Sequence, residues 1–185
     1  MDKSFVIMKK ILVVLFSIVS LISCQDSDKE KKAILSESNG KINNISIFLD
    51  ENLWNGEIGD SIRKKFAAPV DGLPQEEPLF NLNQYPTKIF DGIAQKSRNI
   101  IYVQKGQQFG FSEKVDQYAK PQKVFYVLGK TNDEIIKILE EKSANIIKSI
   151  KASEIIENQV RLKKALVSDQ KVREKFGIGL TIGYG

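Results

Sequence analysis

Two groups of side chains have the types and spacing that nucleophilic or acid–base chemistry requires. Ser61 and Lys64 lie three residues apart, which places a hydroxyl and an amine on adjacent turns of one helix face, the spacing of a serine hydrolase with a lysine base. Asp71, Glu76 and Glu77 stand beside a proline-rich segment and offer the two carboxylates that a glycosidase needs. Ser61 and Lys64 lack the further motifs of such hydrolases, and sequence cannot give the separation of the carboxylates, so a solvated helix face and surface acidity are the favoured interpretations.

The composition excludes several other kinds of site. Among 185 residues there is no His and a single Cys, so the chain has no Ser-His-Asp triad, no Cys-His pair and no His-ligated zinc. One Cys forms neither an intramolecular disulfide nor a thiolate metal cluster. We therefore expect no metal. The 28 basic and 23 acidic residues are interspersed along the chain, which argues against a nucleic-acid partner.

The single Cys follows a segment typical of a secretory leader. Lys9 and Lys10 precede 12 apolar or small residues, at positions 11–22, and the run leads directly into Ser23 and Cys24. That run is shorter than the ~20 residues of a bilayer span, which favours a cleaved signal over a retained helix. The ending Leu-Ile-Ser-Cys is similar to a bacterial lipobox, so residues 1–23 are predicted to be a signal peptide cleaved between Ser23 and Cys24.

A covalent lipid on Cys24 is then the only prosthetic group that we expect, and the membrane is the first expected partner. Two or more acyl chains anchor a protein durably, at ~0.8 kcal/mol per buried CH₂ group. Residues 24–44 are polar and of mixed charge and are predicted to be the lipidated Cys with a flexible tether. Gln25 follows the Cys where an Asp would favour the inner membrane, so we expect a cell-envelope protein on the outer membrane, facing the periplasm or the surface.

Residues 45–185 are predicted to form one α+β domain with a mixed sheet of four to five strands. The expected strands cover residues 45–49, 79–82, 98–104 and 124–128, where β-branched and aromatic residues gather. Apolar residues at helical spacing then predict a short helix before Pro69. Gly59 lies inside that helix, and we expect it to permit a close approach to another backbone.

A long helical segment is predicted to follow the last of these strands. Thr131 and Glu134 have the spacing of a capping box, and an apolar stripe runs from Ile135 to Ile150 before the pattern resumes at Ile156 and Val160. Ser153 is expected to divide this segment into two helices. Residues 178–182 have the pattern of one more strand with nothing after it, which predicts a C-terminally incomplete domain.

Two stretches of the chain resemble a known family. Residues 53–60 (LWNGEIGD) and 72–80 (GLPQEEPLF) are similar to the uncharacterised envelope lipoproteins grouped as domain of unknown function 4837, and the similarity runs from about residue 34 to the end. The resemblance implies lipidation, an envelope location and a longer natural chain. It implies no activity and supplies no catalytic residue.

The function expected from these observations is that of a membrane-anchored structural or interaction module rather than an enzyme. Its candidate contact surface consists of Trp54, Leu73, Gln75 and Phe80, although core packing is favoured for the two aromatic residues. The expected partners are envelope proteins or glycan. The alternative is an envelope hydrolase acting on glycan or peptide, either through Ser61 and Lys64 or through the acidic residues of the proline-rich segment. The oligomeric state stays open.

Overall fold

A computed structural model describes residues 35–72, 74–164 and 170–179 of the chain. Its strands are β1 (Asn44–Phe48), β2 (Asn81–Tyr85), β3 (Asn99–Lys105), β4 (Gly110–Val115) and β5 (Lys123–Gly129). Its α-helices are α2 (Glu51–Trp54), α3 (Glu57–Phe66), α4 (Asn132–Lys164) and α5 (Gln170–Phe176), and two 3₁₀ turns, η1 (Thr87–Ile89) and η2 (Ala94–Lys96), lie between β2 and β3.

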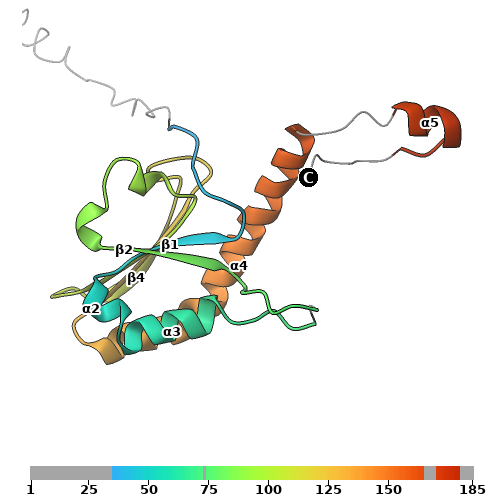
Figure 1. Cartoon of the computed structure of the whole chain (residues 1–185). Coiled ribbons are helices and arrows are strands. Elements are labelled where there is room, and N and C mark those ends of the chain that lie inside the picture. The colour runs from blue at the N-terminus through green and yellow to red at the C-terminus, as the bar shows by residue number, and fades with distance from the viewer. Residues whose placement is uncertain (1–34, 73, 165–169, 180–185) are drawn as a thin grey trace, which may run out of the picture. The chain divides into compact units, whose positions relative to one another are not determined.

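The strands form one mixed sheet in the order β2-β1-β3-β5-β4. Four neighbouring strands, β2, β1, β3 and β5, are parallel, and β4 pairs with β5 in the antiparallel sense. Helices α3 and α4 lie on one face of this sheet, and the segment that contains η1 and η2 lies on the other (Figure 1). The fold is therefore α+β with a five-stranded mixed sheet, which confirms the predicted class.

The main core lies between the sheet and the two helices. Alternate residues of the inner strands, such as Ile47, Ile101 and Phe125, are fully buried there against Ile62 of α3 and Leu139 of α4. This alternation follows from the pleat, which directs successive side chains to opposite faces of a strand. The helix-covered face is apolar along the inner strands except at the start of β3, where the buried Asn99 donates to Glu154 of α4.

The opposite face carries a smaller cluster dominated by aromatic rings. Phe48 packs edge-on against Phe90 with ring centroids 4.6 Å apart, and Phe90 lies 4.9 Å from Tyr102. The Tyr118 and Tyr126 hydroxyls are 2.9 Å apart and share a hydrogen bond. Burial, followed by the contact with Tyr118, raises the pKa of the Tyr126 phenol above its usual value of 10. This face therefore combines rings with polar groups, unlike the helix-covered face.

Gly59 has the role that its place in the sequence predicted. A Cβ atom at this position would lie 1.8 Å from the carbonyl oxygen of Trp54, so only glycine allows α3 to pack this closely on the end of α2. The α4 cap is also present, since the Glu134 amide donates to the Thr131 hydroxyl at 3.2 Å. The Glu134 carboxylate accepts from the Lys130 amide at 2.8 Å, one residue before the donor that a capping box predicts.

Several boundaries differ from those predicted. Strand β2 begins at Asn81 rather than at residue 79, and β4 falls in a stretch where none of the four expected strands was placed. Ser153 does not interrupt α4, which is continuous over 33 residues. Residues 178 and 179 are not in a strand, and the rest of the predicted strand at 178–182 lies outside the described residues.

Candidate functional site: a polar pocket beside a buried ion pair

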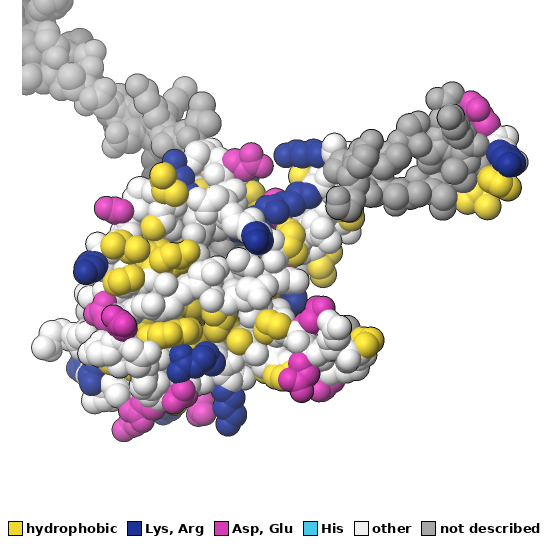
Figure 2. Space-filling model, in the orientation of Figure 1, with side chains coloured by type: hydrophobic (Ala, Val, Ile, Leu, Met, Phe, Trp, Pro, Cys, Tyr) yellow, Lys and Arg dark blue, Asp and Glu magenta, His cyan; other side chains and the backbone are white. Residues whose placement is uncertain are grey.

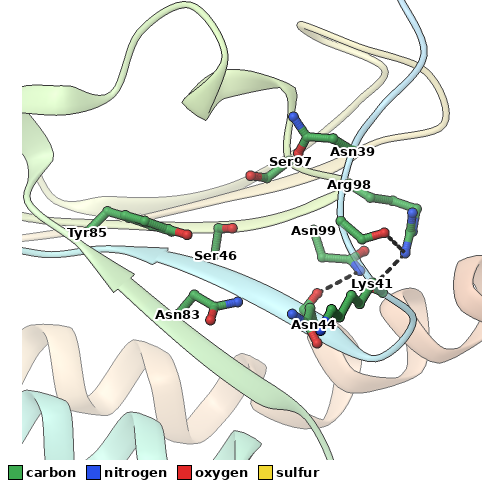
Figure 3. A pocket seen from close by; sticks show the side chains of 10 residues that line it. Asn39, Lys41, Asn44, Ser46, Asn83, Tyr85, Ser97, Arg98 and Asn99 are labelled. Atoms are coloured by element: carbon green, nitrogen blue, oxygen red, sulfur yellow. Dashed lines mark hydrogen bonds between the residues drawn. The ribbon is translucent and has the colours of Figure 1, made fainter.

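A pocket of about 320 Å³ opens beside the amino-terminal halves of β1 and β3 (Figure 3). We call it the polar pocket. Its walls come from residues 39–41, from Asn44 and Ser46 of β1, from Asn83 and Tyr85 of β2, and from residues 97–99. The strand order explains why these segments meet, because β1 lies between β2 and β3 in the sheet although β2 follows it by more than 30 residues along the chain.

A buried ion pair supports one wall of the polar pocket. Arg98 is 2% exposed, and its Nε atom donates to Oε1 of Glu154 on α4 at 2.7 Å. Arg98 Nη2 also donates to the carbonyl oxygens of Gly40 and Lys41, at 3.2 and 2.8 Å. The Nη1 atom makes no hydrogen bond with the described residues, but Oε1 of Glu157 lies 3.8 Å away. The ion pair thus ties α4 to the segment that precedes β1.

Glu154 is held ionised by this arrangement. Burial raises the pKa of the Glu154 carboxyl. Hydrogen bonds from Arg98, from the Asn43 amide and from Asn99 lower this pKa, and together they outweigh burial, so the pKa lies below its usual value. The Asn43 amide donates to Oε2 at 2.8 Å, and Asn99 Nδ2 donates to Oε1 at 2.6 Å. A buried carboxylate with this many donors is fixed in position as well as in charge.

Asn99 has one polar atom that the fold leaves without a partner. Its Nδ2 atom donates to Glu154 and also, at 3.2 Å, to the carbonyl oxygen of Asn44, so both amide hydrogens are used and the amide orientation is set. Its Oδ1 atom has no hydrogen-bond partner among the described residues, although the residue is only 1% exposed. Asn99 lies on the same side of β3 as Ile101, which faces the helices, and its amide therefore points to Glu154. Ser46 and Asn83 are paired across β1 and β2 on the opposite face of the sheet. The Asn99 Oδ1 atom has almost no accessible surface, so it is a cost of the buried ion-pair arrangement and not a group that a ligand reaches.

The two catalytic alternatives from the sequence lie outside the polar pocket. Ser61 is half-buried on α3, Lys64 is exposed on the same helix, and Asp71, Glu76 and Glu77 are all exposed in the loop before β2. Glu76 and Glu77 line a separate, smaller pocket of about 190 Å³ together with Ala67, Pro69 and Pro78. Among the described residues, no group of three or more His, Cys, Asp or Glu side chains could hold a metal ion.

The residues of the expected contact surface differ in burial. Phe80 is fully buried in the core, as favoured for it, and is therefore not available to a partner. Trp54 is half-buried with the Arg63 guanidinium 4.6 Å from its ring centroid, and Gln75 is exposed in the loop. Leu73 lies outside the described residues. Among the described residues, Trp54 and Gln75 therefore keep accessible surface.

The leader and its lipidation site also lie outside the described residues, because these begin at Leu35. No helix among the described residues has the length and apolar character that crossing a membrane requires. The end of the predicted tether does have structure. The Ser38 amide donates to the Lys120 carbonyl at 3.1 Å and the Asn39 amide to the Lys96 carbonyl at 2.9 Å, so residues 36–44 lie against the domain rather than apart from it.

Sequence reasoning missed the residues of the polar pocket. Two signals were present. Asparagine is depleted in strands, yet β2 reads Asn-Leu-Asn-Gln-Tyr, which marks Asn81 and Asn83 as unusual. Glu154 follows Ile150 by four residues and so continues the buried stripe of α4, where an acidic residue requires a buried partner.

Comparison with known proteins identifies the family. The model described as "Domain of unknown function (DUF8532)" matches residues 38–163, which is more than half of the chain, so the chain belongs to that family. The resemblance to domain of unknown function 4837 is therefore wrong, because a different family model covers the residues on which it was based. Neither the curated proteins nor the solved structures provide a match.

Proposed function

For this member of the DUF8532 family, we propose the function of a lipid-anchored envelope protein whose domain binds a small polar ligand in the polar pocket. The observation that carries the binding role is the pocket itself, in which β1 and β2 present Ser46, Asn83 and Tyr85 on one face of the sheet. Side-chain hydrogen-bonding groups that converge in a pocket of this kind are what orient a small ligand.

The anchor part of the proposal is supported by the sequence of the leader. A basic pair, a short apolar run and the order Ser23-Cys24 together favour cleavage and lipidation at Cys24. The family match begins at residue 38, which leaves the leader and most of the predicted tether in front of the matched domain. A domain in this position would be held near a membrane surface while its pocket stays open to the surrounding compartment.

Intact mass spectrometry of the protein extracted in detergent from its native membrane tests the anchor. We expect the mass of a chain that begins at Cys24 with two or three acyl chains, and we expect Cys24→Ser to leave the leader uncleaved. An unmodified mass that includes residues 1–23 in the unaltered protein would overturn the lipoprotein proposal.

Filling the polar pocket tests the binding role. Ser46 is 8% exposed in β1, and Ser46→Val adds two methyl groups to the pocket wall while keeping a residue that favours strands. We expect at least one of three probe classes, neutral sugars, amino acids and inorganic phosphate, to raise the melting temperature of the unaltered protein but not that of Ser46→Val. Ser112→Val is the matched control, since Ser112 is a half-buried strand residue opposite Tyr126 and outside the pocket. Equal shifts in all three proteins, or no shift with any probe, would contradict a ligand site here.

A further inference from the structure

The charges around the polar pocket restrict the ligand. No carboxylate is present among the described residues that line it, so it has no group to hold an ammonium or a divalent cation. The one buried cation, Arg98, already faces Glu154 at 2.7 Å. Lys41 contributes a charge from an exposed position, where solvent screens it. Figure 2 shows basic and acidic side chains interspersed over the face that it draws. These conditions favour a ligand without net charge.

The polar groups of the pocket are of the kind that match hydroxyls. A hydroxyl donates one hydrogen bond and accepts others, so it pairs well with side-chain amides and with other hydroxyls. Asn83 brings both an exposed amide donor and an acceptor, and Ser46, its partner across β1 and β2, adds a hydroxyl that is almost buried. A ligand with several adjacent hydroxyls can donate to and accept from both of these side chains together.

Tyr85 provides an aromatic surface beside these polar groups. Its ring stacks on Phe48 with centroids 5.5 Å apart, which holds it in place, and 36% of the residue stays exposed at the pocket. Aromatic rings in binding sites offer rigid apolar area next to a polar tip. The C–H face of a sugar ring is complementary to such a surface, because a saccharide presents hydroxyls at its edge and C–H groups on its face.

We infer that the polar pocket binds a neutral saccharide, with its hydroxyls on Asn83 and Ser46 and its ring against Tyr85. This inference rests on the proposed binding role of the pocket and names the ligand class. It also gives a chemical identity to the glycan that the sequence left as one of two partner classes.

Saturation-transfer NMR on the full chain, in a detergent without a sugar headgroup, tests the inference. The probes are maltotriose and triacetylchitotriose, with inorganic phosphate as a competitor. We expect at least one trisaccharide to receive magnetisation, Asn83→Ala to weaken its binding about tenfold or more, and phosphate not to displace it. Asn81→Ala is the matched control, because Asn81 is an exposed Asn two residues earlier on the same strand and face and does not line the pocket. Tyr85→Leu is the second variant and should remove most of the signal while retaining an apolar residue.

These experiments distinguish a wrong ligand class from a pocket that binds no ligand. If neither trisaccharide binds, or if Asn83→Ala binds as well as Asn81→Ala does, the saccharide inference is wrong. The binding proposal would survive that result only if another probe still stabilised the protein and did so less in Ser46→Val. Displacement of a bound trisaccharide by phosphate would also overturn the inference, because it would make the pocket an anion site.

Discussion

The two buried regions of this domain are built on different principles. Between the sheet and helices α3 and α4 the interior is apolar, whereas beside the amino-terminal end of β3 it holds Arg98, Asn99 and Glu154, each at most 2% exposed. Apolar burial stabilises a fold without directional demands. A buried ion pair adds little net stability relative to apolar residues of the same size, but it fixes positions. The polar cluster therefore orients the wall of the pocket, while the apolar core supplies stability.

Removing one partner of the ion pair should give the largest effect. In Glu154→Ala, Arg98 stays buried without its main partner, and we expect a loss of about 3–5 kcal/mol in the free energy of unfolding. Urea denaturation followed by circular dichroism measures this loss.

The double variant Arg98→Met with Glu154→Leu is the control for that experiment. Because neither charge then remains, we expect it to recover most of the lost stability. It should nevertheless weaken binding at the polar pocket, since Gly40 and Lys41 in its wall lose the Arg98 donor that holds their carbonyl groups. A double variant as unstable as Glu154→Ala would show that the pair contributes stability rather than position.

A close backbone contact on the helical side should give the next largest effect. Gly59→Ala places a methyl group against the Trp54 carbonyl and forces α2 and α3 apart, at a cost of about 2 kcal/mol. Thermal denaturation measures it. Gly106→Ala is the matched control, because no atom lies within 4 Å of a Cβ at that position. Equal melting temperatures for the two variants would contradict the contact.

A small truncation in the apolar core should cost less. Ile101→Val removes one methylene from a fully buried strand residue, and we expect a loss of about 1 kcal/mol. Ligand binding should be unchanged, because Ile101 faces the helices and not the pocket. If Ile101→Val lowered ligand affinity as well as stability, the apolar core and the polar pocket would not have the separate roles assigned to them.

The smallest expected effect is a loss of folding stability in acid, which arises from protonation of Glu154. Because the pKa of Glu154 is lower in the folded protein than in the unfolded chain, its ionisation stabilises the fold above the unfolded value of about 4.5. This contribution is lost as the pH falls from there through the folded pKa. The stability of the unaltered protein should therefore fall more steeply below pH 4.5 than that of the Arg98→Met, Glu154→Leu variant, as measured by urea denaturation at pH 7, 5, 4 and 3. Parallel pH profiles would contradict this assignment.

Local patterns were sufficient for most of the elements, but not for their edges. Continuous β-branched and aromatic runs identified β1, β3 and β5, whereas β4 was missed because it contains Gly110, Glu113 and Lys114. Its charged residues are satisfied by partners from elsewhere, since the Glu113 carboxylate lies 3.1 Å from the Lys123 ammonium and accepts from the Ser149 hydroxyl. The sequence of β4 alone does not reveal these partners, because they come from other parts of the chain.

The apolar stripe of the long helix was correct only where a sheet lies beneath it. Ile135, Ile146 and Ile150 are buried as predicted, but Ile156 and Val160 are 62% and 40% exposed. The buried face passes through Glu154 instead, because its partners come from β3 and the segment before β1. The pocket escaped prediction for the same reason, as its polar residues are ordinary one by one and acquire a role only through the strand order.

The segment before β1 contributes residues to the pocket and would also be the first part of the domain to respond to tension on the N-terminal side. Residues 36–39 are joined to the rest of the domain through a few backbone hydrogen bonds to Lys120, Lys96 and Arg98, whereas β1 pairs with strands on both of its sides. Tension applied from the N-terminal side, where an anchored chain would be pulled, therefore loads those few bonds first. Asn39 would leave the pocket first, whereas Gly40 and Lys41 are held further by the Arg98 donor to their carbonyl groups. A ligand that contacted these residues would add to the bonds that such a pull has to break.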